Sequence, residues 1–553
     1  MIPNQDITPM EMFARHVGEI PSQVYLRQPK NGEYLEYTWQ QAYERTLRLA
    51  QAFSRDLGLQ KGDRVGILAN NCADWFIADY ALVAIGLIPT PIYATAGESV
   101  ISYVLEHSEA KAIIVGSIAK PEIAQKAIPD TVITIGMSSS SVDWQHSMDE
   151  LISNNQPLAQ EQINQPSLSD IFSIVYTSGS TGKPKGVVIS YENICYSAAV
   201  SVHVLGTGSQ ERYLSYLPLA HVTERGLIEY NSLYCGATVT FNESLDTFLN
   251  DLRNAQTTAF ISIPRLWVKF QSQVLAGIPQ RKLSLLLKIP IVSGIIKRKV
   301  KAQLGFDNTR AYGSGSAPIS PSILQWYQEL DIDISEGWGM SETMGLATTQ
   351  HPFNKTKIGT IGKAVEGFDI KISDSGEVLI KGPGVFSEYY KNPEVTAESF
   401  TDDGYFRTGD KADMDTDGYL KITGRVKDIF KSGKGKYVAP VPIESKLASN
   451  VLIEQLCVMG SGLPAAMAVI VLSPDVAKGM SKEEIAESLV ATVTEVNAQI
   501  EKHEVVGGIY ITNNMWTIDN GLLTPTMKLK RAELEEKYLP ILEDQKETVV
   551  WQS

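Results

Sequence analysis

Short strand-like segments alternate with segments of helical periodicity over the first part of this 553-residue chain. Residues 38–57 repeat apolar positions at helical spacing and begin with a threonine suited to a helix N-cap. Residues 75–85 show the same periodicity, whereas residues 64–68, 112–116 and 132–136 are short apolar runs. Strands that alternate with helices pair in parallel and are covered by helices on both faces. The pattern predicts an α/β fold.

The pattern changes after about residue 362. Residues 368–372, 377–380 and 419–422 are short strand-like runs separated by turns, and they predict a small antiparallel or barrel-like unit. A second break falls at residues 423–428, and the remainder of the chain is typical of a small α+β domain. Because the chain is too long for a single core, its length predicts two or three domains, and the pattern divides it into two. Their expected bounds are 1–426 and 427–553.

The composition is that of an ordinary globular protein, with 43% hydrophobic and 20% charged residues. A formal net charge of −14 argues against a nucleic-acid-binding protein, whose surface would be basic. A site for an anionic nucleotide would therefore have to be a local basic island.

Four cysteines, Cys72, Cys195, Cys235 and Cys457, lie far apart and show no metal-ligand spacing. We expect free and mostly buried thiols, consistent with a reducing, cytoplasmic compartment. The N-terminus lacks the basic start and apolar core of a signal peptide, so none is expected.

The loop at residues 176–186, YTSGSTGKPKG, is the most informative motif for function. It joins two β-branched runs and combines five hydroxyl side chains, three glycines and two lysines. Glycine lets backbone N–H groups approach an anion, hydroxyls donate further hydrogen bonds, and lysine supplies positive charge. Pro184 stands where a Walker loop would have serine or threonine, so the loop predicts a phosphate site of another kind.

The loop resembles the phosphate-binding signature of the adenylate-forming superfamily, which includes acyl-CoA synthetases, luciferases and the adenylation domains of peptide synthetases. Further motifs of that family follow in order at residues 217–221, 313–318, 336–343, 405–410, 424–428 and 520–531. The resemblance implies a large N-terminal domain with two helix-flanked sheets and a barrel-like subdomain, followed by a mobile C-terminal domain.

The resemblance also implies the site residues. It assigns to ATP the residues Thr177, Ser178, Gly179, Ser180, Thr181, Gly182, Lys185, Gly315, Ser316, Ala317, Trp338, Gly339, Met340, Ser341, Asp410 and Arg425. Trp338 replaces the usual tyrosine and keeps an aromatic face for adenine, while Asp410 and Arg425 would contact the ribose. Glu342, with Thr177, would help to hold Mg²⁺, and one carboxylate suffices when phosphates supply the other ligands.

Three further residues receive roles by the same resemblance. His221 would lie beside the carboxylate of the acid substrate, Lys528 would be the catalytic lysine, and Lys427 the hinge of the C-terminal domain. The family usually has glycine before this lysine, but here Met527 stands there, as in the fatty acyl-CoA synthetase branch. For the neighbouring Lys530 and Arg531, a basic turn that opens a helix stays an open alternative.

The activity implied is ATP-dependent conversion of a fatty acid to acyl-AMP and then to its coenzyme A thioester. Residues 91–96 and 261–267 resemble the long-chain branch of the family and imply a long-chain acid. The open alternatives are a ligase that acylates a carrier protein or acts on another carboxylic acid, a non-catalytic nucleotide sensor, and a structural protein of a membrane surface. A homodimer is also open. Chain-length preference depends on the walls of an apolar tunnel, for which the sequence offers no motif.

One apolar stretch, residues 283–296, lies between basic clusters. It is interrupted by Lys288, Pro290 and Gly294 and is too short to span a bilayer. Apolar residues between basic clusters suit the surface of an anionic membrane, so residues 281–301 are a candidate for peripheral contact at the inner face. The alternative, which we favour, is an amphipathic helix packed on its own domain.

Overall fold

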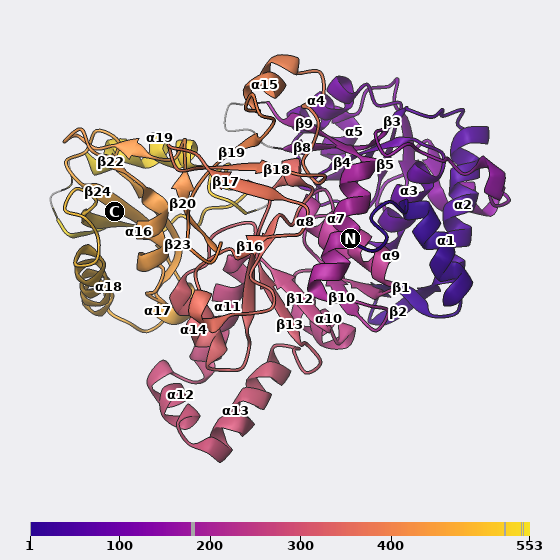
Figure 1. Ribbon diagram of the computed structural model, residues 1–553. Coiled ribbons are helices and arrows are strands. Elements are labelled where there is room, and N and C mark those ends of the chain that lie inside the picture. Colours follow the sequence, from indigo (N-terminus) through magenta and orange to yellow (C-terminus); the bar gives the residue numbers. More distant parts are fainter. Residues whose placement is uncertain (1, 178–182, 525–526, 544, 546, 553) are drawn as a thin grey trace.

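The computed structural model describes residues 2–177, 183–524, 527–543, 545 and 547–552 (Figure 1). A five-stranded sheet of order β4-β3-β5-β6-β7 has only parallel pairs, as the alternating pattern predicted. Its strands are β3 (Arg64–Leu68), β4 (Ile88–Ile92), β5 (Ala112–Val115), β6 (Ile133–Gly136) and β7 (His146–Ser147). The associated helices are α2 (Trp39–Arg55), α3 (Ala73–Ala84), α4 (Glu98–Ser108), α5 (Pro121–Ala127) and α6 (Met148–Ser153).

Helix α2 begins where its sequence predicted. The Thr38 hydroxyl accepts a hydrogen bond from the Gln41 backbone N–H at 3.2 Å, and the Gln41 side chain accepts one from the Thr38 N–H at 2.9 Å. This reciprocal capping box satisfies two N–H groups that the helix itself cannot pair, and such a cap typically contributes ~1 kcal/mol.

Two further sheets and a hairpin belong to the large N-terminal part. The mixed sheet β10-β11-β1-β2 consists of β1 (Val24–Lys30), β2 (Glu33–Thr38), β10 (Arg212–Ser215) and β11 (Thr238–Phe241). The sheet β12-β13-β14-β15-β16 consists of β12 (Ala259–Ser262), β13 (Ala311–Ser314), β14 (Ile334–Trp338), β15 (Thr348–Thr349) and β16 (Lys363–Ala364). The hairpin pairs β8 (Ile171–Thr177) with β9 (Lys185–Ser190) in antiparallel fashion.

Helices surround these sheets. They are α1 (Pro9–Glu19), α7 (Tyr191–Leu205), α8 (Val222–Glu224), α9 (Asn231–Cys235), α10 (Phe248–Ala255), α11 (Pro264–Gly277), α14 (Pro321–Gln328) and α15 (Pro393–Glu398). A π-helical turn, Arg225–Tyr230, follows α8. One large core joins the parallel sheet, the mixed sheet and the β8-β9 hairpin, and all four cysteines of the chain are free and buried, as expected.

The unit expected after residue 362 is a four-stranded antiparallel sheet of order β17-β18-β19-β20. Its strands are β17 (Asp369–Ile372), β18 (Glu377–Lys381), β19 (Phe406–Met414) and β20 (Leu420–Arg425). In the described residues the outer strands β17 and β20 do not pair with each other, so this unit is an open meander.

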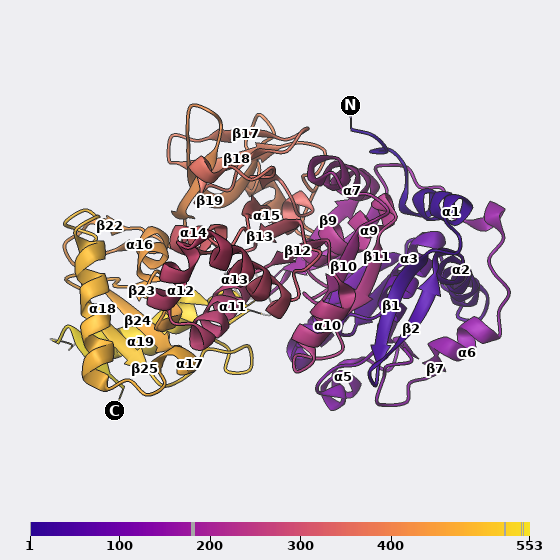
Figure 2. The ribbon, with the colours of Figure 1, turned by 90° about the horizontal axis from the view of Figure 1, so that it is seen from below.

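The C-terminal part is a separate α+β layer at the opposite end of the molecule from the N-terminal helices (Figures 1 and 2). Its sheet β23-β24-β25-β26 consists of β23 (Ile453–Met459), β24 (Ala466–Leu472), β25 (Val506–Thr512) and β26 (Val549–Trp551). A two-stranded ribbon precedes it, β21 (Phe430–Lys431) with β22 (Tyr437–Val438). The helices are α16 (Pro440–Leu447), α17 (Pro474–Ala477), α18 (Lys482–Asn497) and α19 (Arg531–Leu542).

Strand β24 is apolar throughout because both of its faces are covered. Ala468 and Ile470 pack in the core under α16 and α18, while Val469 and Val471 pack in the core under α19. Successive side chains of a strand point to opposite faces, so an uninterrupted apolar run is what a doubly covered strand requires.

Residues 283–296 do not form the single packed helix that we favoured from sequence. They belong to a helical hairpin of α12 (Gln280–Leu287) and α13 (Pro290–Gln303), which projects from the body at the lower edge of Figure 1. Pro290 cannot continue α12 but suits the first turn of α13, and this places the break between the helices. Among the helices of the described residues, none is long and apolar enough to cross a membrane.

Candidate active site

The glycine-rich segments expected around adenine leave neighbouring parallel strands at the same sheet edge. Ser314 of β13 is paired with Glu336 of β14, so the segments that follow both strands lie side by side. A Cβ atom on Gly315 would stand 3.2 Å from the Gly337 carbonyl oxygen, and one on Gly339 would stand 1.4 Å from the Gly345 carbonyl oxygen. No Cβ atom can stand so close to the Gly345 carbonyl oxygen, so packing alone requires glycine at position 339.

Trp338, Asp410 and Arg425 meet in one hydrogen-bonded group. The indole N–H of Trp338 donates to Asp410 Oδ2 at 2.8 Å, and Arg425 Nε donates to Oδ1 at 2.6 Å. Asp410 and Arg425 are cross-strand partners on β19 and β20, which accounts for their contact. The Asp410 charge is the main cause of the raised pKa of Arg425. Trp338 therefore has a second role besides its aromatic face: it holds a buried carboxylate.

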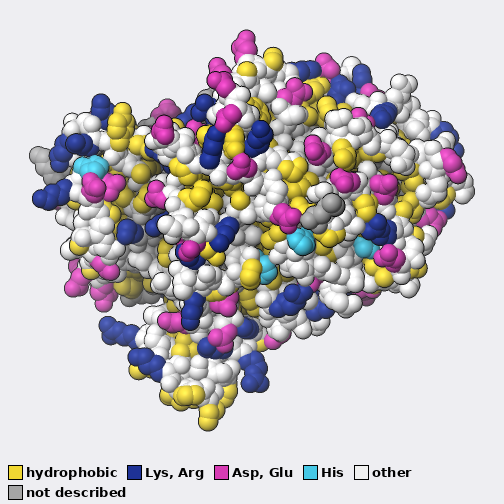
Figure 3. Space-filling model, viewed as in Figure 1, with side chains coloured by type: hydrophobic (Ala, Val, Ile, Leu, Met, Phe, Trp, Pro, Cys, Tyr) yellow, Lys and Arg dark blue, Asp and Glu magenta, His cyan; other side chains and the backbone are white. Residues whose placement is uncertain are grey.

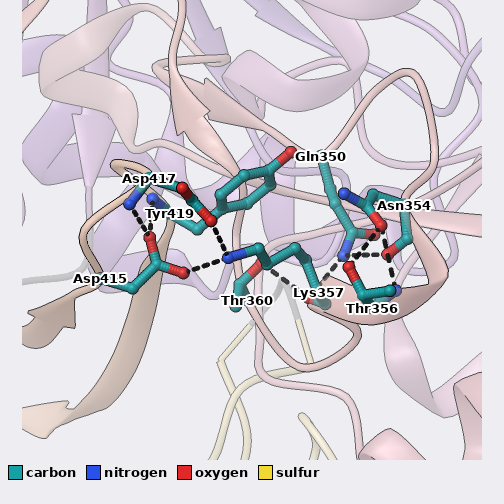
Figure 4. A network of polar contacts seen from close by, with 8 residues as sticks. All are labelled: Gln350, Asn354, Thr356, Lys357, Thr360, Asp415, Asp417 and Tyr419. Atoms are coloured by element: carbon teal, nitrogen blue, oxygen red, sulfur yellow. Dashed lines mark hydrogen bonds and ion pairs between the residues drawn. The ribbon is translucent and has the colours of Figure 1, made fainter.

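A loop after β15 connects the sheet of Trp338 to the sheet of Asp410 (Figure 4). The Lys357 ammonium donates to Asp415 Oδ2 at 2.7 Å and to Asp417 Oδ2 at 2.6 Å, while Gln350 Nε2 donates to the Lys357 carbonyl at 2.6 Å. Buried Glu336 accepts from the Gly359 N–H at 3.0 Å, and burial raises its pKa to about 8. These contacts hold the two sheets at the spacing that the Trp338–Asp410 bond needs.

Glu342 is buried in a 3₁₀ turn and has a hydrogen-bond partner that the sequence did not suggest. The Tyr389 hydroxyl donates to its Oε1 at 2.8 Å, and the Lys185 ammonium lies 4.3 Å above the Tyr389 ring. Tyr389 itself bridges to Val187 of β9, so it links the glutamate to one end of the loop that is predicted to bind phosphate. Among the described residues, no hydrogen bond engages Oε2, which leaves a carboxylate oxygen of the kind that Mg²⁺ prefers.

The β8-β9 hairpin fixes both ends of the glycine-rich loop at residues 176–186. Thr177 pairs with Lys185 in the ladder, and its hydroxyl donates to the Lys185 carbonyl at 3.5 Å. Lys183 lies 5.4 Å from the centre of the Tyr103 ring. The five residues predicted to surround phosphate between these ends lie outside the described residues; they are Ser178, Gly179, Ser180, Thr181 and Gly182.

His221 caps the short helix α8 and is held in one tautomer. Its Nδ1 accepts from the Thr223 backbone N–H at 3.2 Å, so a neutral ring carries its proton on Nε2. Burial, and secondly the positive charge of Lys528, lower its pKa to about 3. The Thr223 hydroxyl is 3.3 Å from the Ser316 hydroxyl, which connects this loop to the glycine-rich segment. At neutral pH His221 therefore presents an N–H donor without a charge.

Asn71, which the sequence did not single out, organises the loop that bears His221. Its Nδ2 donates to the Leu217 carbonyl at 2.6 Å and to Ser215 Oγ at 2.9 Å, and its Oδ1 accepts from the Leu219 N–H at 3.3 Å. Glu224 supports the same loop by accepting from the Tyr216 N–H at 3.0 Å. Neither Asn71 nor Tyr389 belongs to a motif, so no sequence signal would have identified them.

Lys528 belongs to the C-terminal part and lies near the candidate site residues of the N-terminal part. Surrounding protein, and secondly the Arg425 charge, lower its pKa, while the charges of Asp410 and Glu342 oppose that shift. The side chain nevertheless keeps access to solvent. The charges of Arg425, Asp410 and Glu342 thus act on Lys528, whose own charge acts on His221, so Lys528 lies near the residues that the sequence assigned to ribose, metal and acid.

The backbone before Lys528 explains why glycine is usual there. Met527 has φ +64°, a left-handed conformation that costs a side-chain-bearing residue about 1–2 kcal/mol. Arg531 is engaged within the C-terminal part: its guanidinium donates to Glu444 at 2.8 and 2.9 Å and lies 3.5 Å from Asp428. Lys530 is the N-cap residue of α19. The structural alternative for Arg531 is thereby confirmed.

The segment around Lys427 is anchored on both sides. The Val426 N–H donates to the Gly409 carbonyl of β19 at 2.8 Å, whereas Asp428 is joined to the C-terminal part through Arg531. Lys427, in a turn and exposed, is the residue between the two anchors. A rotation of one part against the other would concentrate at this residue.

Comparison with known proteins gives consistent matches. Residues 13–390 match the family described as AMP-binding enzyme, and residues 427–544 match the AMP-binding enzyme C-terminal domain. The chain is 31% identical to the long-chain-fatty-acid–CoA ligase FadD15 of Mycobacterium bovis, over 96% of both chains. It is 26% identical to long chain acyl-CoA synthetase 1 of Arabidopsis thaliana, over 97% of this chain and 92% of the relative.

Solved structures show the same fold at lower identity. The anthranilate CoA ligase AuaEII in complex with anthranoyl-AMP superposes with a TM-score of 0.82 at 21% identity, over 97% of this chain and 98% of that one. The A domain of a carboxylic acid reductase from Segniliparus rugosus, with AMP and a co-purified carboxylic acid, gives 0.81 at 19% identity, over 98% and 94%.

Proposed function

We propose, from the premise that this chain belongs to the AMP-binding enzyme family, that it is an ATP-dependent fatty acid–CoA ligase. It would convert a fatty acid and ATP to acyl-AMP and pyrophosphate, and then transfer the acyl group to coenzyme A with release of AMP. The observation that best supports the proposal is the convergence of Lys528, from the C-terminal part, on His221, Glu342 and Asp410. The long-chain substrate is proposed because FadD15 is named a long-chain-fatty-acid–CoA ligase.

The first step joins two anions. A carboxylate oxygen of the acid attacks the α-phosphorus of ATP, the bond from that phosphorus to the β-bridging oxygen breaks, and pyrophosphate leaves with the electron pair. The Lys528 ammonium would offset the charge that develops at the α-phosphate. His221, neutral with its proton on Nε2, would donate a hydrogen bond to the acid carboxylate. Asp410 and Arg425 would hold the ribose.

Mg²⁺ fits the residues present, since Glu342 has a carboxylate oxygen without a protein donor in the described part of the chain. When bound, the ion would neutralise phosphate charge and orient the leaving group, with Glu342 and Thr177 as the protein residues that hold it. Tyr389 would fix the carboxylate through its hydrogen bond to the other oxygen.

The second step places a thiol at the same carbonyl. The sulfur of coenzyme A attacks the acyl carbon, the bond to the phosphate oxygen breaks, and AMP leaves; the thiol proton passes to solvent. Lys528 would occupy the approach that the thiol needs, so the proposal includes rotation of residues 427–553 against residues 1–426 about Lys427. The anchors at Val426 and Asp428 support this hinge.

The proposal places the enzyme in the cytoplasm, at the inner face of a membrane contacted through residues 281–301, with a homodimer as an alternative assembly. Four buried free thiols support a reducing compartment. The sensor alternative loses support because Lys528 and Glu342, which a non-catalytic protein would not need, face the same site.

Incubation of the purified protein with ATP, Mg²⁺, palmitate and free coenzyme A tests the proposal. We expect AMP, pyrophosphate and palmitoyl-CoA. Formation of ADP would refute adenylate chemistry. Pyrophosphate release without a CoA thioester, but with acylation of a phosphopantetheinylated carrier protein, would support the carrier-protein alternative. A panel of acids from acetate to stearate would define the chain length.

A further inference from the structure

The tip of the α12-α13 hairpin exposes large apolar side chains. Leu285, Ile289, Ile291 and Ile295 are 65%, 50%, 81% and 56% exposed. In Figure 3 the hairpin ends in a hydrophobic tip at the lower edge of the molecule, with Lys and Arg side chains to either side above it. Single exposed apolar residues are ordinary, but a contiguous group at the end of a projecting element indicates a surface that another body covers.

The hairpin is also strongly basic. Residues 280–303 include no Asp or Glu, and they contain seven basic residues, Arg281, Lys282, Lys288, Lys297, Arg298, Lys299 and Lys301. The whole chain has a net charge of −14, so this segment is a basic island on an acidic protein. Of the seven, only Lys297 has an ion pair among the described residues, with Asp331 at 2.8 Å. The other charges are available to an external anion.

The base of the hairpin is firmly held. Leu283 and Val300 are 1% and 2% exposed and pack in one core with Trp267 and Phe270 of α11. Helix α11 follows β12, the strand that pairs with β13 beside the candidate active site. The apolar tip is therefore presented by a rigid base that is continuous with the catalytic sheet.

We propose that the α12-α13 hairpin docks on an anionic lipid bilayer, with the tip side chains among the acyl chains and the basic residues at the level of the phosphates. The arrangement matches the layered chemistry of a bilayer surface, which is anionic at the headgroups and apolar beneath them. The 14 residues of α13 would extend about 21 Å along the helix axis, less than the ~30 Å hydrocarbon core, so the insertion is shallow.

Docking would give the proposed enzyme direct access to a source of its substrate, and this part of the inference rests on the proposed function. A long-chain fatty acid is an amphiphile that dissolves in the same bilayer, and a docked hairpin would bring the catalytic sheet to that source. The substrate would then be taken from the membrane rather than from free solution.

Flotation with lipid vesicles tests the docking directly. The full-length protein is expected to float with vesicles of phosphatidylcholine mixed with phosphatidylglycerol, and less with phosphatidylcholine alone. Ile291→Asp should lower the partition coefficient about tenfold or more, because it replaces an inserting apolar group by a charge. The variant should fold, since an acidic residue in the first turn of α13 is favourable there. The matched control is Leu245→Asp, at a residue 91% exposed outside the hairpin, which should float like the wild type.

A second pair of variants tests how much the basic residues of the hairpin contribute to vesicle binding. Arg281→Gln with Lys282→Gln should weaken binding to the anionic vesicles about fivefold for each positive charge removed, with little change on neutral vesicles. Lys478→Gln with Lys502→Gln removes the same charge from exposed residues of the C-terminal part and should leave flotation unchanged. Added salt should weaken wild-type binding by screening.

The outcomes separate docking from catalysis. If the protein does not float, or if Leu245→Asp impairs flotation as much as Ile291→Asp does, the docking proposal is wrong. It is also wrong if Ile291→Asp abolishes a homodimer in sedimentation and leaves flotation intact, since a second copy would then cover the tip. Flotation without ligase activity would refute the proposed function alone. With both present, Ile291→Asp should slow thioester formation from vesicle-borne palmitate and spare that from palmitate supplied without vesicles.

Discussion

Replacing Trp338 by phenylalanine separates its two roles, because phenylalanine keeps an aromatic face but has no donor for Asp410. The Trp338 N–H lies 2.8 Å from Asp410 Oδ2, and Asp410 is only 8% exposed. Without the indole, water has little access to that oxygen, and Arg425 bonds only Oδ1, at 2.6 Å. The carboxylate that is proposed to bind ribose would then be less well fixed.

The expected size of the effect on ATP binding follows from the charge of the acceptor, the Asp410 carboxylate. Hydrogen bonds to charged groups contribute about 1.5–3 kcal/mol, compared with about 0.5–1.5 kcal/mol for neutral pairs. If Trp338→Phe weakens ATP binding by about 1.4 kcal/mol, the KM for ATP rises about tenfold. The turnover number should change little, because Asp410 is assigned to ribose binding and not to the reacting phosphate. AMP, which shares the ribose, should inhibit about tenfold less strongly.

Trp326 provides a matched control. Its indole N–H donates at 2.9 Å to the neutral Gln280 side chain, in the core cluster beneath the hairpin. Trp326→Phe should lower the melting temperature without changing the KM for ATP. Pyrophosphate release, measured against ATP concentration at saturating palmitate, compares the two variants. An unchanged KM in Trp338→Phe, or an equal rise in both variants, would refute a positioning role for Trp338.

Four further predictions concern the reaction cycle. Lys528→Ala should reduce ATP/pyrophosphate exchange ~10²–10³-fold and spare thioester formation from preformed acyl-adenylate; equal loss of both half-reactions would remove Lys528 from its proposed role. Lys427→Pro should show the reverse, because a fixed φ hinders the pivot, and collapse of exchange would contradict the hinge. Met527→Gly should stabilise the protein by up to about 1–2 kcal/mol in chemical denaturation, since it relieves a φ of +64°, and a lower stability would contradict that strain. Because burial lowers the pKa of His221 to about 3, below the ordinary 6.5, the ring stays neutral as pH falls through 6.5. An inflection of the exchange rate near pH 6.5 that disappears in His221→Gln would show the assignment to be wrong.

The local elements were largely predictable from sequence. Residues 64–68 were predicted as a strand and form β3, and Thr38 caps α2 as its position suggested. Hydrophobic period and capping act within a few residues, so the local sequence determines them. The motif residues were predictable for a different reason: glycines and polar residues mark each motif in the sequence, even where the residue itself lies on a strand, as Trp338, Asp410 and Arg425 do. Their roles still rest on the family resemblance.

The tertiary structure decided which of these residues meet. Trp338 and Asp410 are 72 positions apart and Glu342 and Tyr389 are 47 apart, yet each pair is hydrogen-bonded. Asn71 holds a loop 146 residues later. Such contacts depend on how sheets pack, and no local period encodes that packing. The α12-α13 hairpin illustrates the same limit. Its sequence determined an apolar stretch between basic clusters, but only the packing of neighbouring elements decided that the base is buried and the tip is left exposed.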